Sequence, residues 1–218
     1  LSFVHGDIRD AGLVREIVGG VDVIVNAAAE SHVEKSIEHG ASEFVTTNVE
    51  GTQILLDAIR DTPVERFILI SSSEVYGQVL PDEVPITEHN PLRPLSPYAV
   101  SKVTQEMLAY QYWKSYGVRS IVSRGFNHTG PRRGANFAES TFALQIARIE
   151  KELQEPVIYV GDLTSYRDYT DVRDMIRAYW LLLEHGEPGE VYNIGSGTTH
   201  SMQEVLDTYL SMSRVRVE

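Results

Sequence analysis

Short apolar runs rich in β-branched residues alternate along the chain with longer stretches whose apolar positions recur at helical spacing. Strands are predicted over five runs: "LSFVHGDI" at 1–8, "VDVIVNAAA" at 21–29, "RFILISSS" at 66–73, "RSIVSRGFN" at 119–127 and "EVYNIGSG" at 190–197. Helices are predicted over 10–20, 41–61 and 98–116, the last ending at Gly117. This alternation predicts an α/β fold, a doubly wound parallel sheet with helices on both faces.

The predicted strands at 21–29 and 66–73 are apolar almost throughout, a pattern typical of strands buried on both faces. Four of the predicted strands end in small or polar residues, namely "GDI", "NAAA", "SSS" and "GFNHTGP". Ligands of open parallel sheets bind at the carboxyl ends of the strands. The sequence therefore predicts a ligand crevice at that edge. From about residue 130 the alternation weakens and charges become denser, which indicates a smaller second lobe.

Composition narrows the class of protein. The 218 residues are 42% hydrophobic and 23% charged, close to the globular average, so we expect a folded protein. A formal net charge of −12 argues against nonspecific nucleic-acid binding, and the lack of cysteine excludes disulfides and thiol catalysis. No apolar run has the length of a transmembrane helix and the first ten residues do not resemble a signal peptide, so we expect a cytoplasmic protein without membrane partners. The seven histidines show no ligand spacing, and no metal site is predicted.

The segment "YAVSK" places Tyr98 and Lys102 four residues apart on one face of a predicted helix. An ammonium beside a phenol favours the phenolate, so a lowered pKa is expected for Tyr98, which could then act as a general acid or base. The same helix carries a second pair with this spacing, Tyr110 and Lys114. Tyr98 differs because it lies at the helix start, directly after a loop. We interpret the second pair as surface and packing residues.

Seven motifs occur in a fixed order: "NAAAESHVEKSI", "TNVEGT", "SSSEVYG", "SPYAVSK", "FNHTGPRRGANF", "GDLTSYRDYTDVRD" and "GEVYNIGSG". Together they resemble the extended short-chain dehydrogenase/reductases that act on nucleotide sugars, the epimerase/dehydratase family. "FNHTGPRRGANF" and "SHVEKS" are most similar to the GDP-mannose 4,6-dehydratase group. "RDYTDVRDMIRAYWLL" is equally similar to the related GDP-4-keto-6-deoxymannose reductase. The resemblance implies a dinucleotide-binding Rossmann-like domain over 1–130 and about 170–200, and a nucleotide-sugar-binding lobe over about 131–169 and 198–218.

The family's Gly-rich phosphate loop, G-x-x-G-x-x-G, is not in this sequence. The first predicted strand matches the family's third, and the chain starts without Met, so we expect a fragment that holds a dinucleotide weakly by itself. The residue that selects NAD or NADP would precede residue 1. The resemblance implies that the following residues line the remaining cofactor site for NADP or NAD: Asp7, Ile8, Ala27, Ala28, Ala29, Asn48, Ser71, Tyr98, Lys102, His128 and Arg133.

The resemblance also implies the chemistry of "SSSEVYG". Ser72 would hydrogen-bond the sugar 4-hydroxyl that Tyr98, supported by Lys102, deprotonates during oxidation at C4. Glu74 occupies the position of the dehydratase carboxylate that removes the C5 proton. Ser73 and Glu74 are candidates to relay a proton to the water that leaves C6. The alternative interpretation of Glu74 is a solvated loop carboxylate.

For the nucleotide diphosphate, the resemblance implies contacts from Asn127 and Arg167, with the segment around Val157 packing on the base. Arg132 and Arg133 have two interpretations, a reach to a neighbouring subunit's cofactor phosphate or a solvated surface position. Relatives pair through a four-helix bundle, so a homodimer or homotetramer through residues 98–116 is expected. Two rival functions remain open: a reductase or epimerase on the same fold, and a non-catalytic nucleotide-sugar-binding relative.

Overall fold

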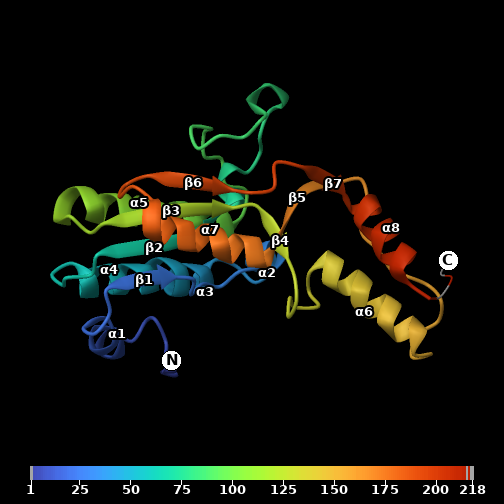
Figure 1. Ribbon diagram of the computed structural model, residues 1–218, viewed down its shortest axis with the longest axis horizontal. Coiled ribbons are helices and arrows are strands. Elements are labelled where there is room, and N and C mark those ends of the chain that lie inside the picture. Colours follow the sequence, from blue (N-terminus) through green and yellow to red (C-terminus); the bar gives the residue numbers. More distant parts are fainter. Residues whose placement is uncertain (1, 215, 217–218) are drawn as a thin grey trace. The chain divides into compact units, whose positions relative to one another are not determined.

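The computed structural model describes residues 2–214 and 216, and it is an α/β protein (Figure 1). The chain divides into two compact units, each described here by itself. The first comprises Leu1–Phe126 with Ile176–Ile194, and the second comprises Asn127–Met175 with Gly195–Glu218. The long helix α7 (Val172–His185) begins in the second unit and continues into the first.

The first unit is built on a four-stranded parallel sheet of order β1-β2-β3-β6. Its register pairs, for example, Ile68 of β2 with Ile121 of β3. The other elements of this unit are helical segments in the loops and on the faces of the sheet. The strands are β1 (Val23–Asn26), β2 (Arg66–Ser72), β3 (Ser120–Gly125) and β6 (Val191–Ile194), and the helices are α1 (Ala11–Val18), α2 (Val33–Glu38), α3 (Ser42–Phe44), η1 (Val45–Glu50), α4 (Gly51–Ile59), η2 (Ser73–Tyr76), η3 (Pro81–Glu83) and α5 (Pro97–Tyr116).

Alternation along β2 explains why helices cover both faces of this sheet. Phe67 and Leu69 point to one face, where they pack with apolar residues of α1, α4 and α5. Ile68 points to the other face and packs with Ile121 and with Leu182 of α7. Because apolar side chains emerge from both faces of β2, the strand is stable only when both faces are covered. This arrangement confirms the predicted doubly wound sheet.

The helix α5 has clear sequence signals at both ends. The Ser96 side chain accepts a hydrogen bond from the Ala99 backbone N–H, and Pro97 occupies the first helical position. Gly117 ends the helix in a left-handed conformation with φ of 77°, as glycine does without strain. Tyr98 is therefore fixed in the first turn, next to the loop that precedes it.

Two expectations about the first unit are wrong. Of the strand predicted over 1–8, the described residues 2–8 form none, because no described strand pairs with them. The strand β1 was expected to be buried on both faces, but Val23 and Val25 are 44% and 41% exposed. The reason is topological, because β1 is an edge strand whose other edge has no partner among the described strands.

The second unit contains a three-stranded sheet of order β4-β5-β7, in which β4 and β5 are parallel and β5 and β7 antiparallel. Its core joins Phe142 of α6 with Met202 and Leu206 of α8. The elements are β4 (Asn127–Thr129), α6 (Ala138–Glu150), β5 (Tyr166–Asp171), β7 (Thr199–Ser201) and α8 (Met202–Met212). In the part of the chain that the structure describes, no helix has the length and apolar character of a membrane span.

Candidate active site

The end of β2 and the turn after it carry the serines and the carboxylate singled out in the sequence. Ser72 is the last residue of β2 and caps η2, its hydroxyl accepting a hydrogen bond from the Glu74 backbone N–H at 3.2 Å. Ser73 is half-buried and Glu74 is exposed. A hydrogen bond joins the hydroxyl of Ser72 to the phenol of Tyr98, so β2 and α5 meet at these two side chains.

Tyr98 and Lys102 are one turn apart, and the Lys102 ammonium lies 5.9 Å from the centre of the Tyr98 ring. Lys102 is only 4% exposed and donates a hydrogen bond to the backbone oxygen of Ile70 at 2.8 Å. Burial lowers the pKa of Lys102 from 10.5 to about 8, against an opposing contribution from Glu106.

The expected lowering of the Tyr98 pKa is wrong for the described structure. Burial raises the pKa of Tyr98 above its ordinary value, the hydrogen bond from Ser72 lowers it, and the charge of Glu74 raises it again. The ammonium of Lys102 is directed to the Ile70 carbonyl and makes no hydrogen bond to the phenol in the structure, so desolvation of the phenolate decides the direction. The phenol is accordingly protonated near neutral pH.

The end of β1 is held by Asn48, which is fully buried in the π-helical segment η1. Its side-chain oxygen accepts from the Glu30 backbone N–H at 2.7 Å, and its amide donates to the Glu30 carbonyl and to the Ser101 hydroxyl. The chain between Asn26 and Glu30 consists of Ala27, Ala28 and Ala29, of which the first two are exposed. Asn48 thus fixes a backbone stretch with small side chains and ties it to α5.

A buried ion pair behind this site was not predicted. Arg124 of β3 and Glu106 of α5, 4% and 1% exposed, form a salt bridge at 2.6 Å. The Ser71 hydroxyl donates to Glu106 at 2.5 Å, and Arg124 donates to the phenol oxygen of Tyr76 at 2.9 Å. The Ser71 hydroxyl has therefore used its proton, and toward a cofactor it could only accept a hydrogen bond. The available signal was spacing, because Glu106 continues the four-residue repeat of Tyr98 and Lys102.

Near the N-terminus, Asp7 and Ile8 have different surroundings. The Asp7 carboxylate is exposed and accepts hydrogen bonds from the Arg9 guanidinium and backbone, which lower its pKa from 3.8 to about 2. Ile8 is half-buried and packs on the core formed with α1, α4 and α5. Their predicted place in the cofactor site stays a prediction.

In the second unit, Asn127 and His128 lie on β4 and Arg167 on β5. Arg167 is exposed, and its guanidinium donates to the Tyr166 carbonyl at 2.7 Å. Val157 lies in a loop and is 37% exposed. The structure places these residues on one unit, and their roles toward a ligand stay predictions.

Arg133 is held within its own unit. Its guanidinium donates to the His128 carbonyl at 2.6 Å, forms an ion pair with the buried Glu139, and lies 3.8 Å from the centre of the Phe137 ring. Neither of the two interpretations given for Arg133 included this set of contacts. Arg132 is exposed.

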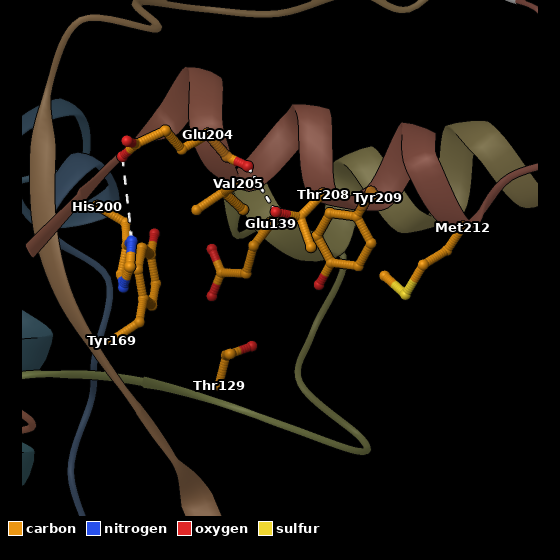
Figure 2. Close-up of a pocket in the computed structure, with 9 residues that line it drawn as sticks. All are labelled: Thr129, Glu139, Tyr169, His200, Glu204, Val205, Thr208, Tyr209 and Met212. Atoms are coloured by element: carbon orange, nitrogen blue, oxygen red, sulfur yellow. Dashed lines mark hydrogen bonds and ion pairs between the residues drawn. The ribbon is translucent and has the colours of Figure 1, made fainter.

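The second unit also contains a cavity of about 330 Å³ (Figure 2). Its lining combines the buried carboxylate of Glu139 with apolar and hydroxyl side chains from β5 and α8. None of the residues predicted to bind substrate lines it. The lining residues are Thr129, Glu139, Tyr169, His200, Glu204, Val205, Thr208, Tyr209 and Met212.

Comparison with known proteins identifies the family. The family model described as GDP-mannose 4,6 dehydratase matches residues 1–217. The chain belongs to this family. It is 40% identical over 208 residues to the low-salt glycan biosynthesis protein Agl12 of Haloferax volcanii, covering 95% of this chain and 64% of Agl12. The chain of this GDP-mannose 4,6 dehydratase family member thus spans less than two thirds of that relative's length.

Two solved structures of the family's wider fold superpose closely. RMD from Pseudomonas aeruginosa, complexed with NADPH, has a TM-score of 0.94 at 34% identity, covering 99% of this chain and 74% of RMD. DesIV, a dTDP-glucose 4,6-dehydratase from Streptomyces venezuelae with NAD and TYD bound, has a TM-score of 0.86 at 39% identity, covering 97% and 63%. The predicted membership of the extended short-chain dehydrogenase/reductases and the Rossmann-like fold are confirmed.

Proposed function

We propose that this protein is a nucleotide-sugar 4,6-dehydratase that converts GDP-mannose to GDP-4-keto-6-deoxymannose. The observation that carries the proposal is the placement of Ser72, Tyr98 and Lys102 together at the end of β2, with Glu74 on the turn that follows. The Ser72 hydroxyl bonds the Tyr98 phenol, Lys102 lies beside that phenol, and Glu74 follows two residues after Ser72 on an exposed turn. A non-catalytic binding protein has no need of this combination.

Each of these groups has a place in the reaction. In its phenolate form, Tyr98, bonded to Ser72, takes the proton of the sugar 4-hydroxyl while C4 is oxidised to a ketone. Because the ketone acidifies the C5–H bond, the Glu74 carboxylate can remove the C5 proton, and a proton passed from Glu74 or Ser73 lets water leave C6. Since burial raises the pKa of Tyr98, the phenolate needs a nearby cation, and Lys102 supplies one.

The residues present fit a nicotinamide dinucleotide on structural grounds. Ala27 and Ala28 are exposed, have minimal side chains, and follow the strand end that Asn48 fixes, so a ligand can approach the backbone there. Tyr98 and Lys102 would hold its nicotinamide ribose. When bound, NADP or NAD would accept the hydride from C4 and supply it to C6, so no net reductant is used.

GDP-mannose is proposed because the matching family model carries that description and because "FNHTGPRRGANF" resembles this group. Asn127 and Arg167 are proposed to bind the diphosphate, and a guanidinium suits that charge. Val157 would pack on the base. His128 is proposed beside the nicotinamide, and Arg133 would have to leave Glu139 to reach a phosphate.

A reductase acting on a 4-keto sugar is the second candidate. It is favoured by the 37% identity over 198 residues to the GDP-6-deoxy-D-mannose reductase of Pseudomonas aeruginosa. The two functions differ in stoichiometry, because a reductase consumes one reduced cofactor per sugar and a dehydratase consumes none.

Homodimer formation through α5 is also proposed, since Met107 and Tyr110 of this helix are 51% and 50% exposed.

The experiment compares Tyr98→Phe with Tyr110→Phe in the protein as its full gene encodes it. Tyr110 has its own lysine, Lys114, 5.6 Å from the ring centre, so it is a matched control for a tyrosine with a lysine four residues on. Tyr98→Phe should keep nucleotide-sugar binding and lose turnover by about a hundredfold or more. Tyr110→Phe should keep both. Turnover unchanged in Tyr98→Phe would end the catalytic assignment.

A further inference from the structure

The catalytic segment Ser72–Glu74 is attached at both ends to one buried ion pair. On the side before it, the Ser71 hydroxyl donates to Glu106 at 2.5 Å. On the side after it, the phenol oxygen of Tyr76 accepts from Arg124 at 2.9 Å. Glu106 and Arg124 bind each other through three hydrogen bonds of 2.6 to 3.2 Å.

Tyr76, through which the second end of this segment is attached, is also linked by hydrogen bonds to further elements of the first unit. Its phenol donates to the Asn193 side chain of β6 at 2.7 Å, and the Asn193 backbone N–H donates to Glu88 at 2.7 Å. Arg124 also donates to the Glu88 carbonyl at 3.1 Å. A guanidinium has five donors, so Arg124 can bind Glu106 and Tyr76 at the same time. A lysine ammonium could not do this with the same geometry.

Lys102 binds the same stretch of β2. Its ammonium donates to the carbonyl of Ile70, and Glu106, one turn further along α5, binds the next residue, Ser71. Two charged side chains of α5 are thus hydrogen-bonded to consecutive residues of β2, immediately before Ser72. Because they lie on the same helix face, the Glu106 carboxylate also acts as a countercharge to Lys102.

We propose that Glu106, held by Arg124, is a positioning residue that fixes the Ser72–Glu74 segment against α5 and supplies the countercharge behind Lys102. This proposal deepens the proposed function and rests on it. Neither Glu106 nor Arg124 reaches the exposed strand end, since both are at least nine-tenths buried. They act on the chemistry through Ser71, Tyr76 and Lys102.

The charge on Glu106 opposes the effect of burial on Lys102, and the pKa that results from the two is about 8. Glu106 is the charge that raises this pKa. Other titratable groups on the elements around α5 include Tyr98 on α5, Arg124 on β3, Glu74 and Tyr76 on η2, Tyr179 on α7, Glu34 and Lys35 on α2, Glu43 on α3, Glu50 on η1, Asp57 on α4 and Glu88 in the loop before α5.

The test measures kcat and KM against pH for Glu106→Gln in the protein as its full gene encodes it. Because the variant leaves Arg124 without its carboxylate, the double variant Glu106→Gln/Arg124→Met is made beside it to keep a folded form. Ser120→Ala is the matched control. The buried Ser120 hydroxyl joins β3 to the α5 carbonyl of Ala109, and its hydrogen bond involves neither Ser71 nor Tyr76. All rates are divided by the folded fraction.

We expect kcat to fall at least tenfold in both Glu106 variants, with KM within twofold. In Glu106→Gln alone, the basic limb of kcat should move to lower pH by about one unit as Lys102 loses its countercharge. In the double variant the shift should be smaller, because the positive charge of Arg124 is removed together with the negative charge of Glu106. Ser120→Ala should change neither kcat nor its basic limb. Folded variants with the wild-type kcat and pH limb would overturn the proposal.

A second readout does not depend on turnover. In protein labelled with ¹³C at lysine Cε, Lys102 is assigned by its loss in Lys102→Arg, and its titration is compared in wild type and Glu106→Gln. A titration at lower pH in the variant supports the countercharge even if no tested sugar is turned over. Absence of turnover with every tested sugar would contradict the proposed function alone. An unmoved titration overturns the countercharge.

Discussion

Replacing Lys102 by methionine tests how burial acts on the site. Methionine has about the length of the lysine stem and lacks the charge. In the folded protein the ammonium is 4% exposed, and its pKa is lowered from 10.5 to about 8. The unfolded chain holds the same group in water at its ordinary pKa. Burial of the charged lysine therefore opposes folding at neutral pH.

The magnitude follows from the two pKa values. One pH unit of pKa shift corresponds to about 1.4 kcal/mol, so the buried ammonium lowers the free energy of unfolding by about 3 kcal/mol below pH 8. Losing the hydrogen bond to the Ile70 carbonyl offsets about 1–2 kcal/mol of this gain in the variant. We expect Lys102→Met to be more stable than wild type by about 1–2 kcal/mol at neutral pH.

The sign of the pH dependence is fixed by proton binding. Between pH 8 and 10.5 the unfolded chain binds more protons at this lysine than the folded chain does. The wild-type free energy of unfolding therefore rises with pH relative to the variant across that window. Above it, the variant should be the less stable protein, because the wild type then buries a neutral amine that keeps its hydrogen bond.

Urea unfolding of both proteins at pH 7, 8, 9 and 10 measures this difference. Lys102→Met should also lose turnover at every pH, which separates its stability from its activity. A stability difference that does not change with pH would refute the account of a desolvated ammonium. A difference that changes in the opposite direction would show that the folded site stabilises the charge.

Three further substitutions test packing and geometry. Leu56→Ala empties a fully buried position in the core between the sheet and α4, and unfolding experiments should show a loss of about 3–4 kcal/mol; a loss below about 1 kcal/mol would contradict the core assignment. Gly77→Ala adds a Cβ against the Arg93 carbonyl at a φ of 55°, so turnover and stability should both fall, whereas Gly20→Ala, with open space, should change little. Asn48→Ala removes the two hydrogen bonds to the Glu30 main chain; we expect weaker NAD(P) binding by isothermal titration, and unchanged affinity would contradict the proposed role of the β1 end.

Much of the first unit could be predicted because its signals are local. The apolar run predicts β2 as a strand with both faces covered, and Ser96 and Gly117 mark the two ends of α5. Each of these signals lies within a few adjacent residues. The errors arise where burial or pairing depends on residues far away in the sequence. Val23 and Val25 have the composition of a buried strand, but β1 lies at the edge of the sheet, so they are exposed.

The candidate site shows the same division. The small and polar residues at the strand ends predicted a site there, and the family resemblance supplied the roles of Ser72 and Glu74, which stay predictions. Spacing could not give the direction of the Tyr98 pKa, because desolvation depends on everything packed around the ring. Nor could it reveal the Glu106–Arg124 pair, whose partners are 18 residues apart in sequence and meet only after β3 folds against α5.

The central claim is tested most directly by the mass of the product. The protein as its full gene encodes it is incubated with GDP-mannose and, separately, with dTDP-glucose, without added reducing cofactor. The account predicts that GDP-mannose loses the mass of one water and that dTDP-glucose is unchanged. Loss of water from dTDP-glucose alone would contradict the substrate, and no mass change in either sugar would contradict the dehydratase and the role of Glu74 as the C5 base.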